Sequence, residues 1–142
     1  MSRPMAEKAI RDDFPKNTAV ISFHDPKTHR TPADYVPLDY GNTCERLFPV
    51  ALHDIDPEIL ENYGLTMAAY FPERHDVARF ILSAIHDGMD IICQCEYGQS
   101  RSAGCAAAIK EFLDRTGIEV FADYRYYPNP LVFNKMLDAL PC

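Results

Sequence analysis

The segment Met89-Asp90-Ile91-Ile92-Cys93-Gln94-Cys95-Glu96-Tyr97-Gly98-Gln99-Ser100-Arg101-Ser102-Ala103-Gly104-Cys105 decides the fold of this 142-residue chain. Its short apolar run from Ile91 to Cys93 predicts a strand that is buried on both faces. The small residues after Arg101 predict a helix that packs closely against a sheet. Between the two lies a loop that begins at Cys95 and reaches an arginine six positions later.

This loop has the composition of an anion-binding site. A chain that folds back between a strand and a helix directs several backbone N–H groups into one concavity, and the helix start adds its positive end. Arg101 offers a planar fork of donors to two oxygens, and Gly98 lets the backbone turn without a Cβ in the way. The loop therefore predicts a site for a tetrahedral dianion such as phosphate. The expected phosphate-binding residues are Glu96, Tyr97, Gly98, Gln99, Ser100 and Arg101.

The cysteine at the floor of this concavity is the predicted nucleophile. A positive site lowers the pKa of a thiol, so we expect Cys95 to be a thiolate that attacks phosphorus. Ser102 follows the arginine, and its hydroxyl is placed to donate a hydrogen bond to the sulfur and to assist its departure in a second step.

At these residues the chain resembles the cysteine-dependent protein tyrosine phosphatase superfamily, and in particular its small dual-specificity-like members. Their signature is His-Cys-x-x-Gly-x-x-Arg-Ser/Thr, and this chain reads Gln94-Cys95-Glu96-Tyr97-Gly98-Gln99-Ser100-Arg101-Ser102. The residue before the cysteine departs from the pattern, since Gln94 can form hydrogen bonds but cannot carry charge. The resemblance covers most of Leu47 to Leu140 and implies a phosphatase fold and a cysteinyl-phosphate intermediate.

A second informative stretch is His53-Asp54-Ile55-Asp56-Pro57, which follows a predicted strand from Arg46 to Leu52. A leaving oxygen needs a proton, and a carboxylic acid opposite the thiolate can donate it and then act as the base for water. In the resembled family an Asp at the end of such a strand has this role. Asp54 is our first choice and Asp56 the alternative, because Asp56 precedes a proline and can cap the next segment. We expect an insertion between Ile59 and Ala69 to form a flap over the cleft.

The remaining elements predict an α/β fold with a central, mostly parallel sheet of four or five strands and helices on both sides. Thr18 to Phe23 reads as a core strand, and Ile118 to Phe121 as a short extended piece. Helices are predicted at 5–13, at 72–87 and after Pro130, where Asn129 is the expected N-cap. We expect a single domain over 1–142, with an N-terminal segment at 1–17 and a catalytic core at about 18–140.

Composition excludes several classes of function. A net charge of −7 disfavours nucleic acid or an anionic membrane as the main partner, since both require a basic face. Neither a membrane span nor a signal peptide is evident, and five cysteines without framework spacing indicate a reducing compartment, so we expect a cytoplasmic monomer. The histidines and cysteines lack metal-ligand spacing, so no metal and no organic cofactor is expected.

These observations predict a phosphomonoester hydrolase with Cys95 as nucleophile and Arg101 as phosphate clamp. Asp54 or Asp56 is the expected acid, and Ser102 is expected to assist release of the thiolate. The substrate is a phosphorylated protein, as for a tyrosine or dual-specificity phosphatase, or a small phosphomonoester. Two alternatives stay open. One is a catalytically weak or dead phosphate-binding module, which Gln94 favours. The other is a rhodanese-like or arsenate-reductase-like enzyme, which also uses a cysteine loop.

Overall fold

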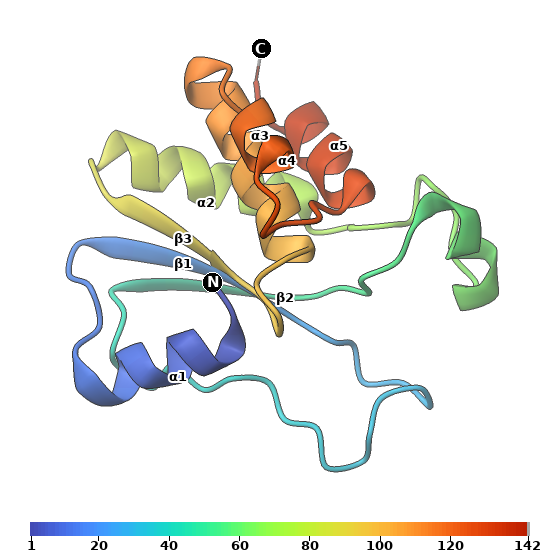
Figure 1. The fold of residues 1–142 in the computed structure, drawn as a ribbon, viewed down its shortest axis with the longest axis horizontal. Coiled ribbons are helices and arrows are strands. Elements are labelled where there is room, and N and C mark those ends of the chain that lie inside the picture. The colour runs from blue at the N-terminus through green and yellow to red at the C-terminus, as the bar shows by residue number, and fades with distance from the viewer. Residues whose placement is uncertain (142) are drawn as a thin grey trace.

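A three-stranded parallel sheet lies at the centre of the computed structural model, which describes residues 1–141 (Figure 1). β1 (Thr18–His24) lies between β2 (Arg46–Ala51) and β3 (Asp90–Gln94). The predicted α/β fold with a parallel sheet is confirmed. The predicted number of four or five strands is wrong, because the described residues form three.

The parallel arrangement brings the functional segments to one edge of the sheet. Ser22 of β1 is in register with Gln94 of β3, and Phe23 with Val50 of β2. The chain leaves all three strands at this carboxyl edge, which is where open α/β sheets bind ligands. The loop that begins at Cys95 therefore lies beside the segments that follow β1 and β2.

β3 is an edge strand, and this corrects one expectation. Ile91 and Ile92 are half-buried, although their apolar run predicted a strand covered on both faces. One side of β3 pairs with β1, and the other meets the backbone of Met1. The Met1 nitrogen donates to the Cys93 carbonyl at 2.9 Å, and the Cys95 N–H donates to the Met1 carbonyl at 3.1 Å.

Helices cover both faces of the sheet, as predicted (Figure 1). α1 (Arg3–Asp12) lies on one face, and α2 (Arg74–His86), α3 (Arg101–Asp114) and α5 (Pro130–Ala139) lie on the other. The two faces bury separate hydrophobic clusters. The smaller cluster, on the α1 side, has Ala6, Phe14, Val20 and Tyr40 at its centre.

Two segments differ from their predicted form. Ile118–Ala122 is a short helix, α4, and not an extended piece. It starts as a turn, in which the N–H groups of Glu119 and Val120 donate to the carbonyls of Thr116 and Gly117. The insertion after β2 forms a 3₁₀ helix, η1 (Pro57–Tyr63), which projects to the side of the sheet (Figure 1).

The start of α5 matches its sequence prediction. The Asn129 side-chain oxygen accepts from the N–H groups of Leu131 and Val132 at 2.9 and 3.1 Å, and Pro130 takes the first helical position.

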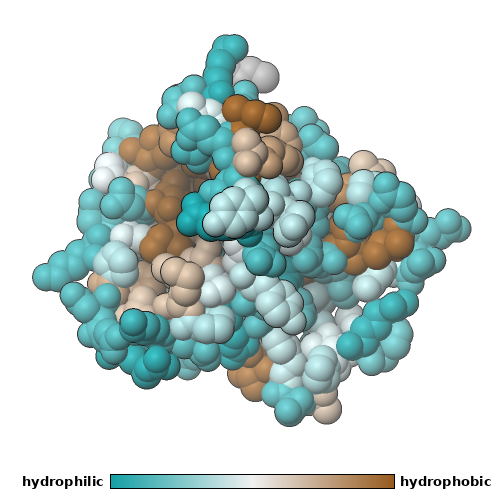
Figure 2. All heavy atoms as spheres, in the orientation of Figure 1, coloured by the Kyte–Doolittle hydropathy of each residue, from teal (hydrophilic) through white to brown (hydrophobic). Residues whose placement is uncertain are grey.

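The surface is mixed in character. On the face drawn in Figure 2, hydrophilic residues predominate and hydrophobic ones gather in separate patches. None of the described helices has both the length and the apolar character to cross a bilayer.

Candidate active site

The Cys95 thiol lies at the base of the loop between β3 and α3, with 3% of the residue exposed. Its sulfur is 3.2 Å from the Ser102 hydroxyl, and the Gly98 N–H donates to it at 3.3 Å. Ser102 is in the first turn of α3, so the helix start faces the sulfur. The structure thus brings Cys95, Gly98 and Ser102 together.

The surroundings lower the pKa of the Cys95 thiol below its ordinary value. Burial alone raises that pKa. Hydrogen bonds from the hydroxyl and N–H of Ser102, the positive charge of Arg101 and the Gly98 N–H all act in the other direction and together outweigh burial. These groups stabilise the thiolate, which is the reactive form of cysteine.

Gln94 holds the base of the loop through an uncharged network. Its side chain is 1% exposed, and its Oε1 accepts from the hydroxyls of Ser22 at 2.5 Å and Tyr40 at 2.9 Å. With the oxygen fixed in this way, Nε2 donates to the Cys95 carbonyl at 2.9 Å. Gln94 therefore orients the first peptide of the loop without placing a charge beside the thiol.

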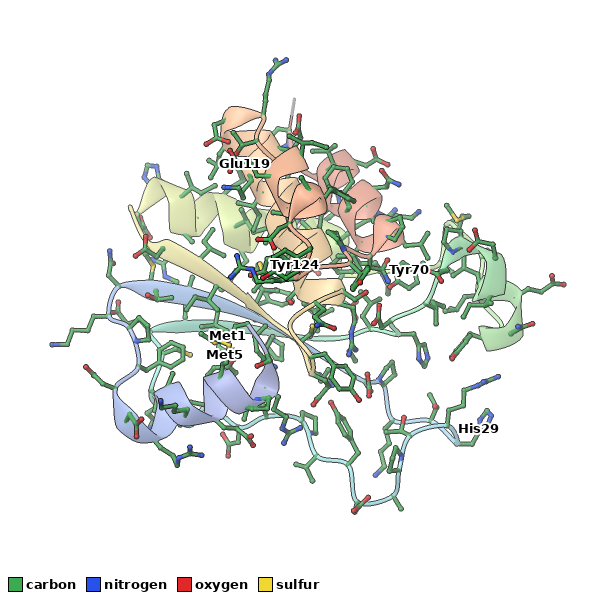
Figure 3. All side chains as sticks on the ribbon, in the orientation of Figure 1. Met1, Met5, His29, Tyr70, Glu119 and Tyr124 are labelled. Carbon is green, nitrogen blue, oxygen red and sulfur yellow. The ribbon has the colours of Figure 1, made fainter. Side chains whose placement is uncertain are left out.

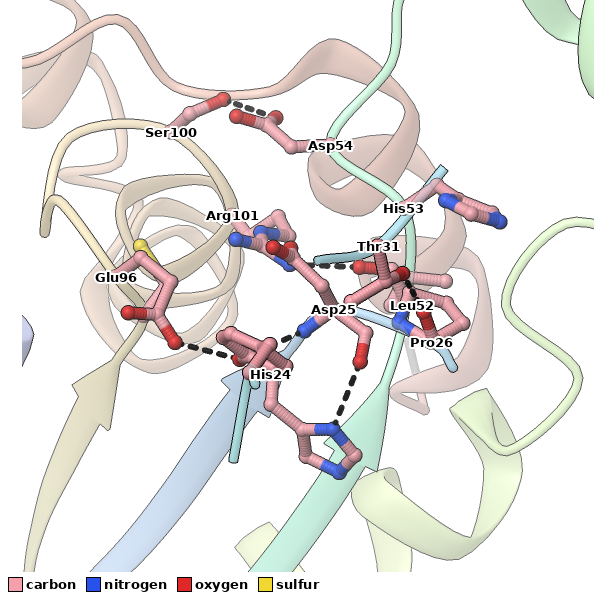
Figure 4. Close-up of polar contacts among 12 residues, drawn as sticks. His24, Asp25, Pro26, Thr31, Leu52, His53, Asp54, Glu96, Ser100 and Arg101 are labelled. Atoms are coloured by element: carbon pink, nitrogen blue, oxygen red, sulfur yellow. Dashed lines mark hydrogen bonds and ion pairs between the residues drawn. The ribbon is translucent and has the colours of Figure 1, made fainter. Parts of the chain in front are cut away.

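Arg101 is buried at the first position of α3, with 3% of the residue exposed. Its NH1 donates to an Asp25 carboxylate oxygen at 2.8 Å and to the Leu52 carbonyl at 2.7 Å (Figure 4). Its Nε is buried and has no hydrogen-bond partner among the described residues. A buried donor without a partner is costly, and an anion in the loop would satisfy it.

The two candidate acids occupy different places. The Asp54 carboxylate accepts from the Ser100 hydroxyl at 2.5 Å and from the Asn129 amide at 2.9 Å, so it is tied to the loop and to the start of α5 (Figure 4). Asp54 also lines the cleft that contains Arg101. Asp56 is exposed at the N-cap of η1, makes no side-chain capping bond, and does not line that cleft.

The other loop residues form its outer wall. Glu96 accepts from the Tyr35 hydroxyl at 2.6 Å and from the Arg3 guanidinium at 3.3 Å. Burial and the bond to Glu96 raise the pKa of Tyr35 to about 12, so Tyr35 stays a donor. Tyr97 is 81% exposed. Gln99 holds the chain before α5 through its carbonyl, which accepts from the Tyr127 N–H at 2.8 Å.

Gly98 is required at its position. Its φ is +72°, and a Cβ there would lie 2.5 Å from the backbone nitrogen of Ser2. The N-terminal segment thus packs directly on the loop, and the Arg3 N–H donates to the Glu96 carbonyl at 2.9 Å.

Arg101, Glu96 and Tyr97 line a cleft of about 720 Å³. The expected flap is not part of it, because no residue between Ile59 and Ala69 lines the cleft. The side of the cleft is instead formed by the N-terminal segment and by Pro32 and Tyr35 of the long loop after β1.

Sequence reasoning missed several of these groups. Asp25 follows β1 as Asp54 follows β2, so the rule that parallel strands end at one edge was a signal for Asp25. Arg3 and Tyr35 carry no comparable signal, since they reach Glu96 from 93 and 61 positions away. Within residues 1–141, no group of three or more His, Cys, Asp or Glu side chains is placed to hold a metal ion.

Comparison with known proteins gives a structural likeness only. No family model matches the sequence, and no curated protein sequence does. Among solved structures, the chain is similar to the human tyrosine phosphatase-like serine/threonine/tyrosine-interacting protein, with a TM-score of 0.56 and 12% sequence identity over 96% of this chain and 80% of that one. It is also similar to PTPMT1, with a TM-score of 0.49 and 16% identity over 98% of this chain and 84% of that one. At 12% identity, the likeness to the first of these two structures establishes the fold alone.

Proposed function

The chain has the fold of the cysteine-dependent tyrosine phosphatase superfamily, and from this premise we propose that it is a phosphomonoester hydrolase of the protein tyrosine or dual-specificity phosphatase type. The observation that carries the proposal is the buried Arg101 guanidinium, whose Nε has no hydrogen-bond partner within residues 1–141, beside a thiol with a lowered pKa. The two groups together suit a dianion that is to be attacked by sulfur.

In the first step the Cys95 thiolate attacks phosphorus, and the bond from phosphorus to the ester oxygen breaks. Arg101 and the loop N–H groups hold the equatorial oxygens, and Asp54 transfers a proton to the leaving oxygen. The products are an alcohol or phenol and a phosphocysteine.

In the second step water attacks the phosphocysteine, and Asp54 takes a proton from that water. The bond from sulfur to phosphorus breaks, inorganic phosphate leaves, and the thiolate returns. The Ser102 hydroxyl stabilises the departing sulfur, because it lies 3.2 Å away. The mechanism needs neither a metal nor an organic cofactor.

The test is hydrolysis of p-nitrophenyl phosphate by the unaltered protein and by a Cys95→Ser variant. We expect the variant to lose turnover while it still binds phosphate or vanadate, since Arg101 and the loop are unchanged. Undiminished turnover by Cys95→Ser would contradict the mechanism.

A phosphate-binding module without catalysis is the second candidate. The neutral Gln94 network favours it, because no charged imidazole lies beside the thiol. The reactivity of Cys95 with iodoacetate distinguishes the hydrolase from the binding module. A reactive Cys95 at pH 6 supports the hydrolase, and an inert one supports the binding module.

A further inference from the structure

The cleft lined by Arg101 is rich in carboxylates. Its charged lining consists of two arginines and four acids, namely Arg3, Arg101, Glu7, Asp25, Asp54 and Glu96, and it includes no lysine or histidine. With all four carboxyl groups ionised, the lining carries an excess of two negative charges. A bound phosphate dianion adds to that excess.

Both cations in the cleft are already engaged by carboxylates. Arg101 pairs with Asp25 at 2.8 Å, which leaves its Nε for one phosphate. Arg3 lies between Glu7 at 3.5 Å and Glu96 at 3.3 Å. A second anionic group beside the phosphate would therefore meet carboxylates and no free cation within the lining.

The basic residues near the cleft are directed elsewhere. Lys27 does not line this cleft and instead lines a second cavity of about 470 Å³, which shares Pro32 and Tyr35 with it. The Arg30 guanidinium stacks on the Tyr63 ring, 4.3 Å from its centroid. His29 is at the outer tip of its loop (Figure 3).

His53 is a poor source of positive charge. Burial lowers the pKa of its imidazole below the ordinary value of about 6.5, which favours the neutral ring.

The uncharged part of the lining suits an aromatic ring. Tyr35 and Tyr97 both line the cleft, and Pro4 and Pro32 add apolar surface. Such walls hold a phenyl group by stacking and hydrophobic contact. Glu96, Tyr97 and Arg101 of the phosphate-binding loop also line the cleft, and Arg101 is placed to hold the phosphoryl group.

Resting on the proposed function, we propose that this site takes phosphotyrosine in a peptide whose neighbouring residues are positively charged, and that it selects against a second anion beside the phosphate. Lysine or arginine next to the phosphotyrosine would pair with the excess carboxylates that line the cleft. Glutamate at the same position would be repelled by them.

The test compares two phosphotyrosine peptides that differ in their flanking residues, lysine in one and glutamate in the other. Dissociation constants are measured on the Cys95→Ser variant, which does not consume the peptide. We expect the lysine peptide to bind about three- to tenfold more tightly at low ionic strength, as for partly exposed charge pairs. The difference should shrink in high salt because exposed charges are screened.

Reversing the charge of one cleft carboxylate tests whether the peptide preference arises from the cleft. Glu7→Lys in the Cys95→Ser background should reduce or invert the ratio of the two dissociation constants. Asp138→Lys makes the same change in net charge on the exposed side of α5, and should leave the ratio unchanged.

Equal affinities for the two peptides would overturn the proposal, as would tighter binding of the glutamate peptide or no binding of either. Turnover of p-nitrophenyl phosphate by the unaltered protein tests the hydrolase separately. Absent turnover together with a lysine preference would contradict the hydrolase and support the charge selection.

Discussion

Ser102 contributes to the site through one hydroxyl. It lies 3.2 Å from the Cys95 sulfur and is, after burial, the largest influence on the pKa of that thiol. A hydrogen bond to an anion is stronger than one to a neutral group, so this contact favours the thiolate over the thiol. The chemistry at Cys95 thus depends on a neighbour that itself forms no bond to phosphorus.

We therefore expect Cys95 to be alkylated by iodoacetamide with a midpoint below the ordinary thiol pKa of about 8.5. The thiolate predominates above the lowered pKa, so the rate rises through that value and then levels off. Ser102→Ala should move the midpoint up by about one unit, equivalent to about 1.4 kcal/mol. The measurement is the rate of alkylation against pH, with the modified cysteine identified by mass spectrometry.

Cys105 is the internal control for this experiment. Hydrogen bonding with Cys93 and complete burial raise the pKa of Cys105 well above its ordinary value, so it should stay unmodified. A midpoint that Ser102→Ala leaves unchanged would show that the hydroxyl does not stabilise the thiolate.

Asp54 gives a prediction that depends on the leaving group. Asp54→Asn should lower kcat for phenyl phosphate by about a hundredfold or more, as expected for loss of a general acid. The loss should be much smaller for p-nitrophenyl phosphate, because p-nitrophenolate leaves without a proton. Steady-state kinetics on both esters make the comparison.

Asp56→Asn is the matched variant, two residues away on the same segment. It should change neither ester's kcat by more than a few fold, since Asp56 is outside the cleft with Arg101. If Asp56→Asn showed the leaving-group dependence instead, the assignment of the acid would move to Asp56.

Among the elements, the contact between α3 and α5 positions the acid. Asn129 caps α5, and its amide also donates to Asp54 and to the Ile55 carbonyl. Its backbone N–H donates to the Ser100 carbonyl at 3.0 Å, so the helix start, the Asp54 segment and the loop meet at one residue. Gly104 permits this approach, because a Cβ there would lie 2.7 Å from the Asn129 carbonyl oxygen.

Gly104→Ala should therefore destabilise the protein by about 1–3 kcal/mol, the usual cost of overpacking. The sign of the change in unfolding free energy is informative, because alanine in a helix interior is by itself about 1 kcal/mol more favourable than glycine. Urea unfolding followed by circular dichroism measures the free energy of unfolding. A stabilised variant would show that α3 and α5 can separate without cost.

In the molecule as a whole, the face of the sheet opposite α3 also supports the site. Phe14 follows α1 and packs edge-on against Tyr40, with ring centroids 5.8 Å apart. The Tyr40 hydroxyl in turn donates to Gln94, which holds the Cys95 carbonyl. The smaller hydrophobic cluster is thus joined to the loop through two buried hydrogen bonds, from Tyr40 to Gln94 and from Gln94 to the Cys95 carbonyl.

Phe14→Ala should lower the free energy of unfolding by about 3–5 kcal/mol, as for other buried phenylalanines. Phe121→Ala removes the same atoms at a site that is 40% exposed and should cost clearly less. Thermal and urea unfolding of the two variants give the comparison. Equal losses would mean that the cluster on the α1 side adds nothing beyond surface packing.

The local features of this protein were predictable from its sequence. The strand, loop and helix around Cys95 follow from hydrophobic pattern and from glycine and small residues in adjacent positions. The Asn129 cap of α5 is likewise a short-range signal. These features depend on neighbours within one or two turns, which the order of residues specifies directly.

The partners of these residues depend on how the elements pack. Arg101 binds Asp25, Glu96 binds Arg3, and Asn129 binds Asp54, and each pair is separated by 75 or more positions. The half-burial of Ile91 and Ile92 in β3 and the helical form of Ile118–Ala122 also follow from packing and contradicted their local patterns. Propensity and periodicity describe the chain near a residue, whereas burial and pairing depend on which distant segment lies against it.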